Sequence, residues 1–119
     1  MSTFNALKVR TTNMRKLTIK RLNTFVGCGA KVKVYIEDKE HDELLIKGHF
    51  CRKIGEIRNN KELTVEIDEN EHKIFVIFDI LSKDSCCGVA LVKEGTEDVI
   101  LQGKCKFNPF LGNPFTFIE

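Results

Sequence analysis

The sequence predicts an all-β protein, an antiparallel β-sandwich of about seven to nine strands with an immunoglobulin-like or jelly-roll-like arrangement. Three observations lead to this prediction. Apolar and polar side chains alternate along several short segments, and turn residues separate these segments at intervals of about 8–12 residues. No window of about twelve residues shows the apolar stripe of an amphipathic helix.

Four segments alternate most clearly and are predicted to be half-buried strands: residues 16–20, 30–37, 62–67 and 98–107. Residues 73–80 are apolar at successive positions, which predicts a central strand with both faces covered. Residues 82–92 fit neither a strand nor a helix clearly. The core is predicted on the apolar faces of these strands, at Val34, Val65, Val76, Phe78 and Leu101.

Turn chemistry separates the predicted strands. Lys47-Gly48, Asn59-Asn60 and Glu94-Gly95 each follow an apolar run, and the polar residues 68–71 follow another. Glycine and asparagine tolerate the positive φ angles that tight turns require. These positions therefore predict hairpin-like connections within one domain.

The domain is predicted to span residues 16–119, behind a basic arm at residues 1–15. The arm shows no alternation, so we expect it to be flexible unless a partner holds it. At this length a single domain buries enough surface to fold without a metal or disulfide bonds. The composition also lacks any apolar run of about 18 residues, which argues against a membrane-spanning helix.

Charge is distributed unevenly along the chain. Residues 1–36 hold eight of the 19 Lys and Arg residues and none of the 17 Asp and Glu residues. Such a segment can bind an anionic polymer or surface, or it can neutralise the acidic remainder of its own domain. The candidate anion-binding residues are Lys8, Arg10, Arg15, Lys16, Lys20 and Arg21. The segment holds only three aromatics, Phe4, Phe25 and Tyr35, so nucleic acid is not the favoured partner.

The five cysteines do not resemble a secreted disulfide framework, because their number is odd and no Cys-x-x-Cys pair occurs. The first residues also lack the apolar stretch of a signal peptide. We therefore expect a cytoplasmic protein with reduced thiols. Cys105 lies in the apolar register of its strand, where a buried thiol acts as a small hydrophobe.

His49 and Cys51 are the candidate metal ligands. They are two residues apart, so on a strand both side chains point to one face and would form half of a zinc site. The spacing is not that of a zinc finger or ribbon, and no catalytic signature surrounds any cysteine. We therefore expect no metal, no cofactor and no enzymatic activity.

The aromatic segment near residue 110 supplies the candidate partner-binding residues. Two Asn-Pro turns enclose Phe110 and Leu111, and Phe115 follows the second turn. Apolar side chains at a loop tip either fold back on the core or form an interaction patch. The interaction alternative assigns Phe110, Leu111 and Phe115 to contact with a partner protein or a second copy of the chain. If the segment after the second turn is a strand, however, Phe115 and Phe117 share a face and would pack inward.

Residues 44–78 resemble small bacterial β-sandwich modules of the PEGA type. In these modules a turn glycine, a short strand, an Asn or Gly turn, an alternating strand and a further His-x-hydrophobic strand follow in order. The matching positions are Gly48, Gly55, Asn60, Leu63, Val65, Ile67, His72, Ile74 and Val76. No Pro-Glu-Gly triplet precedes His72, and residues 80–119 lie outside the resemblance. The resemblance implies a non-catalytic binding or structural role.

The function predicted from these features is that of a non-enzymatic interaction module of a bacterial cytoplasm. The first alternative is a binder of an anionic polymer or surface through the basic segment. The second alternative is a small metal-binding protein or enzyme that uses His49 and a cysteine.

Overall fold

A computed structural model describes residues 14–24, 31–40, 44–46, 48–78, 87–105 and 115–118. Predictions for most of the basic arm, including Lys8 and Arg10, and for the loop tip at Phe110 and Leu111 lie outside the described residues. The described residues form the strands β2 (Met14–Arg21), β3 (Val32–Glu37), β4 (Leu44–Ile46), β5 (His49–Ile57), β6 (Glu62–Asp68), β7 (His72–Phe78), β8 (Cys87–Val92), β9 (Val99–Cys105) and β10 (Phe115–Ile118). The described residues form no helix. This part of the chain therefore contains no helix that could cross a membrane.

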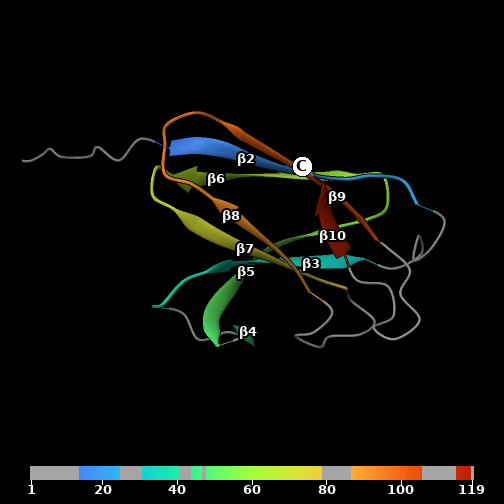
Figure 1. The fold of residues 1–119 in the computed structure, drawn as a ribbon, viewed down its shortest axis with the longest axis horizontal. Helices are drawn as coiled ribbons and strands as arrows, with labels where there is room; N and C mark the ends of the chain where they lie inside the picture. The colour runs from blue at the N-terminus through green and yellow to red at the C-terminus, as the bar shows by residue number, and fades with distance from the viewer. Residues whose placement is uncertain are drawn as a thin grey trace, which may run out of the picture.

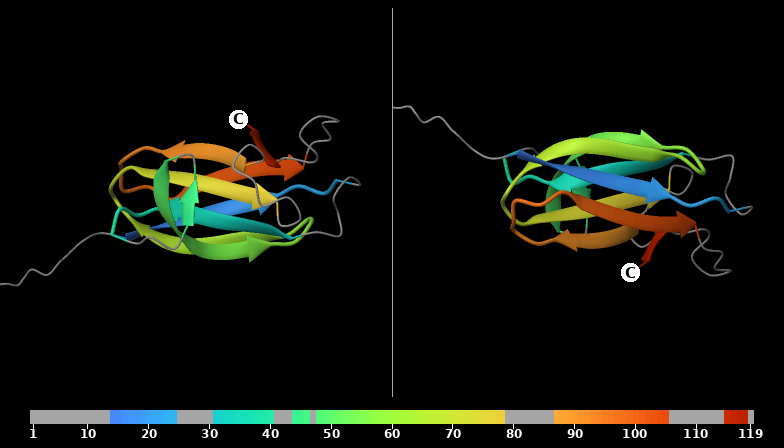
Figure 2. Two further views of the ribbon diagram at one scale, coloured as in Figure 1. Left: turned by 90° about the horizontal axis from the view of Figure 1, so that it is seen from below. Right: turned by 90° about the horizontal axis from the view of Figure 1, so that it is seen from above.

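The strands form the two packed sheets of a β-sandwich (Figure 1). One sheet has the order β10-β9-β2-β6, and the other has the order β4-β5-β3-β7-β8. Figure 2 shows the two sheets from opposite sides, with β4 in front of the five-stranded sheet in its left view. The prediction of an all-β sandwich is confirmed.

Most described neighbours pair antiparallel, but β2 and β9 pair in parallel. Their register runs from Leu17 opposite Val99 to Arg21 opposite Gly103. Two strands so far apart in the chain are joined through the other sheet rather than by a hairpin, so they are free to run in the same direction.

Apolar side chains from both inner faces form the main core. Leu17 and Ile19 of β2 face Val34 and Val76 of the other sheet, and all four side chains are inaccessible to solvent. Val65 and Leu101 pack at the margin of this core. The predicted inward faces of these strands are therefore confirmed, while the side chain of Phe78 lies outside the described part.

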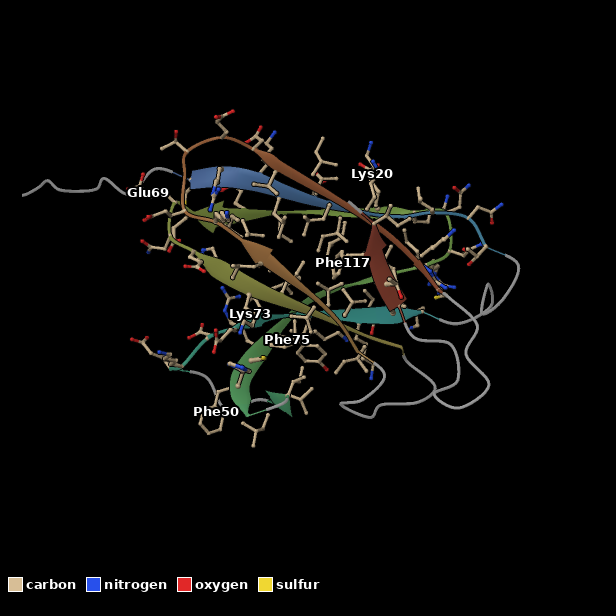
Figure 3. All side chains as sticks on the ribbon, viewed as in Figure 1. Lys20, Phe50, Glu69, Lys73, Phe75 and Phe117 are labelled. Carbon is tan, nitrogen blue, oxygen red and sulfur yellow. The ribbon has the colours of Figure 1, made fainter. Side chains whose placement is uncertain are left out.

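Strand β7 lies between β3 and β8, as its continuous apolar run predicts. Ile74 and Val76 face the main core, whereas Phe75 and Ile77 join a second cluster on the outer face of the sheet. The β4–β5 hairpin curls over that outer face and covers the second cluster with Ile46 and Cys51. Figure 3 shows Phe75 beneath β7, close to this hairpin.

Two backbone features shape the hairpins. The register of β3 and β5 shifts between Val34 and Tyr35, which makes Ile54 an extra residue in β5 and favours the bend of that strand. Gly48 and Asn60 have φ angles of 83° and 62°, in the left-handed region that the sequence predicts for these turns.

Two boundaries differ from prediction. Strand β2 begins at Met14, so Met14 and Arg15 belong to the sheet rather than to the arm. Strand β8 occupies residues 87–92 of the segment with no clear pattern. The inward-facing residues of β8 include Gly88 and Ala90, which are small, so the alternation of apolar and polar residues is weak. This explains why the sequence pattern does not predict β8 as a strand.

Candidate functional site

Two of the predicted anion-binding residues are structural, which corrects that prediction. Arg15 and Arg21 lie on the inner face of β2, at either end of Leu17 and Ile19, and both are buried. Arg15 donates to the carbonyl oxygens of Asp68, Asn70 and Lys93 at 3.1, 3.0 and 2.8 Å.

Arg21 closes the other end of the strand in a similar way. Its Nη1 donates to the carbonyl oxygen of Ile57 at 2.8 Å. Buried cations require such hydrogen-bond acceptors. These two arginines therefore bind backbone carbonyl groups at the two ends of the core rather than a ligand.

Lys16 and Lys20 do reach the surface, on the outer face of β2. Their register partners on β6 are Glu66 and Glu62, and Thr18 and Thr64 are hydrogen-bonded between them at 3.0 Å. Opposite charges at directly opposed positions attract each other across the sheet. This arrangement supports the alternative in which the basic strand neutralises an acidic strand of its own domain.

His49 and Cys51 lie on one face of β5, as their spacing predicts. The His49 ring is hydrogen-bonded to the Glu37 carboxylate and lies 5.7 Å from the Phe75 ring, centroid to centroid. Cys51 is buried, and its thiol donates to the carbonyl oxygen of His49. In the part of the chain that the structure describes, no group of three His, Cys, Asp or Glu residues could hold a metal.

Cys105 is buried, as its register predicts. Burial raises the pKa of its thiol, although the neighbouring Arg21 guanidinium acts in the opposite direction. Arg21 Nη2 lies 3.4 Å from the Cys105 sulfur. A thiol with a raised pKa and no exposure is a poor nucleophile.

A polar hollow of about 670 Å³ lies at one end of the sandwich, where β3 ends and β7 begins. Two pairs of its side chains contact each other: Arg52 Nε lies 2.9 Å from an Asp38 carboxylate oxygen, and His72 Nε2 lies 2.7 Å from Asp68. Burial opposes ionisation of Asp68, but the backbone N–H of Asn70 and the His72 ring outweigh it and lower the pKa of Asp68. The pairs stabilise the loops that form this hollow.

Phe115 was predicted to contact a partner, and the structure corrects this. Its side chain is only 1% exposed and belongs to the main core. It lies against Gly88 of β8 and Gly103 of β9, and its ring makes an edge-on contact with Phe117 at 5.3 Å. The Phe115 side chain lies inward because Gly88 and Gly103, which face it, leave room for its ring.

Beside Phe115 lies an uncharged groove of about 740 Å³, between β8 on one side and β9 and β10 on the other. These strands are nearest the viewer in Figure 1. The described residues that line the groove include no charged side chain: Gly88, Val89, Ala90, Leu91, Ile100, Leu101, Gln102, Phe115, Thr116, Phe117 and Ile118. The groove therefore differs in chemistry from the charged hollow at the end of the sandwich.

Four exposed apolar side chains belong to the groove. Val89 and Leu91 project from β8 and are 43% and 51% exposed, while Ile100 and Ile118 project from β9 and β10. Val89 and Leu91 lie on the outer face of the five-stranded sheet, and Ile100 and Ile118 lie on the outer face of the four-stranded sheet. Large apolar side chains that remain exposed are typical of a contact surface.

Strand β8 is also the outer strand of its sheet, so one edge of its backbone pairs with no described strand. The other outer strands are protected in known ways: β4 and β10 have three and four residues, and β6 carries Glu62 and Glu66. Strand β8 has six residues with neither a charge nor a proline. Among the described outer strands, β8 is therefore the one best suited to pair with another strand.

Sequence reasoning placed a candidate interaction surface at Phe110 and Leu111, which lie outside the described residues, and did not single out β8. The signal was nevertheless present, since residues 86–92 form an uncharged run in a highly charged chain. No protein-family model and no curated protein matches this chain.

Proposed function

We propose that this protein is a non-enzymatic interaction module that binds an extended polypeptide segment along the free edge of β8. The observation that carries the proposal is that β8 is an uncharged outer strand whose second edge pairs with no described strand, beside an uncharged groove. In strand addition, backbone hydrogen bonds supply affinity and side chains at alternate positions supply specificity. Here Val89 and Leu91 are the alternate side chains that the added strand would cover.

The rest of the described surface supports the same assignment. Arg15 and Arg21 serve the core, Lys16 and Lys20 oppose glutamates, and the polar hollow contains the ion pairs Arg52–Asp38 and His72–Asp68. The resemblance of residues 44–78 to PEGA-type modules also implies a non-catalytic role. An uncharged groove favours a partner segment that is itself uncharged and alternates small and apolar residues.

A labelled peptide tests this proposal. The peptide carries the sequence of β8 with serine in place of its cysteine, flanked by lysines for solubility, and its fluorescence anisotropy is followed as the protein is added. We expect saturable binding, weakened about 10-fold or more by Leu91→Lys because this side chain lies on the covered face.

Leu45→Lys is the matched control, because Leu45 is 53% exposed but lies on β4 at the opposite edge of the sheet. It should leave the affinity unchanged. A peptide with proline at its centre should not bind, because proline removes a backbone donor. Equal binding by the Leu91→Lys and Leu45→Lys variants, or no binding of the β8 peptide, would contradict the proposed function.

A further inference from the structure

We propose that the strand added to β8 is β8 of a second copy of this chain, paired antiparallel about a two-fold axis at Ala90. This inference rests on the proposed function and names the partner. The pairing would join two five-stranded sheets, edge to edge, into one continuous sheet. An interface of this kind must be complementary to itself, because both copies present the same residues.

Strand β8 has this self-complementarity. In a register centred on Ala90, Val89 lies opposite Leu91 of the second copy, and Gly88 lies opposite Val92. Val89 and Leu91 point to the outer face of the sheet, since they are the register neighbours of Phe75 and Lys73 on β7. Four exposed apolar side chains, two from each copy, would therefore cover one another. Apolar cross-strand pairs of this type stabilise a sheet.

Charge distinguishes β8 from the outer strand of the other sheet. In the Ala90-centred register, Lys93 lies opposite Cys87 of the second copy, so no like charges oppose each other. The corresponding self-pairing of β6 about Thr64 would place Glu62 opposite Glu66 of the second copy, twice. Like charges at directly opposed positions are destabilising. The described sequence of β8 thus permits the pairing that β6 disfavours.

The groove gives the second copy room to approach. The inward-facing positions of β8 beside the groove are Gly88, which has no side chain, and Ala90, which has a small one. A strand added to β8 would extend the five-stranded sheet past this groove. The contact would cover Val89 and Leu91 on the outer face of that sheet.

Sedimentation velocity of the full chain over a range of concentrations tests the proposal with three double variants. Val89→Lys with Leu91→Lys places two lysine–lysine pairs in the interface and should weaken dimerisation by at least about 100-fold. Val89→Lys with Leu91→Glu places two Lys–Glu pairs there and should restore the dimer, with an affinity that falls as salt is added.

The control is Leu45→Lys with Phe50→Lys, a directly opposed pair on the β4–β5 hairpin with 53% and 45% exposure. Figure 3 shows Phe50 pointing away from the body of the molecule. This control should dimerise like the wild type. Thermal melting of each variant at a concentration where it is monomeric should give similar midpoints, which separates lost pairing from lost folding.

Three results would overturn the proposal: a wild-type chain that stays monomeric, a control variant that loses the dimer as the lysine pair does, or a Lys–Glu variant that fails to restore it. Binding of the β8 peptide by a chain that stays monomeric would refute self-pairing and leave the proposed function standing. Absence of both peptide binding and dimerisation would refute the two together.

Discussion

The two long sides of the sandwich, where the outer strands of the sheets meet, are closed in different ways. On one side β5 turns into β6, and the Leu63 side chain lies over Gly55. On the other side β10 lies beside β8, and Phe115 fills the space against Gly88 and Gly103. Both sides use glycine to admit a large apolar side chain, but only the first side also carries charges along its outer strand.

The two sides differ in the chemistry of their outer strands. The glutamates of β6 oppose lysines of β2 and keep that outer strand from pairing with another chain. The β8–β10 side has an uncharged groove and exposed Val89, Leu91, Ile100 and Ile118. A β-sandwich can thus exclude water from its core on both sides and still expose uncharged, apolar side chains on one of them.

Phe115→Ala should have the largest effect on folding. Removing a buried aromatic side chain costs about 3–5 kcal/mol of unfolding free energy, through lost burial and the cavity that remains. Urea denaturation measures the change. Phe50→Ala, at an exposed position, is the control and should change stability by less than about 0.5 kcal/mol. Equal effects of the two variants would mean that Phe115 does not seal the β8–β10 side.

Substitution by alanine should lower stability more at Gly88 than at Gly55. A Cβ atom at Gly88 would lie 2.5 Å from the backbone oxygen of Phe115, whereas one at Gly55 would lie 2.7 Å from the end of the flexible Leu63 side chain. Gly88→Ala should therefore cost about 1–3 kcal/mol, because strand β8 or β10 must move.

Gly55→Ala should be close to neutral. Leu63 can adopt another rotamer, and the reduced freedom of the unfolded chain offsets the remaining strain. Thermal melts of the two variants measure the contrast. A larger loss at Gly55 than at Gly88 would refute the view that the β8–β10 side is closed by backbone contact.

Arg15 connects the two sides, because it donates to the carbonyl oxygens of Asp68 at the end of β6, Asn70 in the following turn and Lys93 after β8. Arg15→Met keeps most of the apolar stem and removes the donors, and it should cost about 1–2 kcal/mol in unfolding free energy. Lys16→Met, at an exposed neighbour, should cost less. Hydrogen exchange should be faster in the turns before β7 and after β8 in the Arg15 variant. Unchanged exchange in both turns would show that Arg15 does not couple them.

The smallest expected effect is the pH dependence contributed by Asp68. Its pKa in the folded protein lies below the usual value of 3.8, so the stability that it contributes is present above that value. This contribution is lost as the pH falls through the lower folded pKa. Urea midpoints of the wild type and Asp68→Asn should differ most near neutral pH and converge in acid. A difference that widens in acid would contradict the assigned shift.

Local pattern was enough to predict most strands and turns. Alternation at a period of two identifies β2, β3, β6 and β9, because neighbouring side chains in any extended strand must point to opposite faces. Gly48 and Asn60 mark turns, since few other residues adopt a positive φ at low cost. The same alternation places Arg15 and Arg21 in register with Leu17 and Ile19, although their charge suggested a surface role.

The residues of a candidate site could not be assigned in the same way, because their environment comes from distant parts of the chain. Phe115 is buried only because Gly88 and Gly103 leave space for it. Arg15 is satisfied by carbonyl groups up to 78 positions away in the sequence. Neither fact has a local signature.

Strand content, turn positions and inward faces were therefore encoded locally, in the period and chemistry of neighbouring residues. The distribution of strands between sheets, the parallel pairing of β2 with β9 and the curl of the β4–β5 hairpin required the assembled fold. So did the status of β8 as an unprotected outer strand, because an edge exists only relative to the strands that surround it. Pairing and burial are properties of neighbours in space, and the chain brings those neighbours together from positions that no local pattern connects.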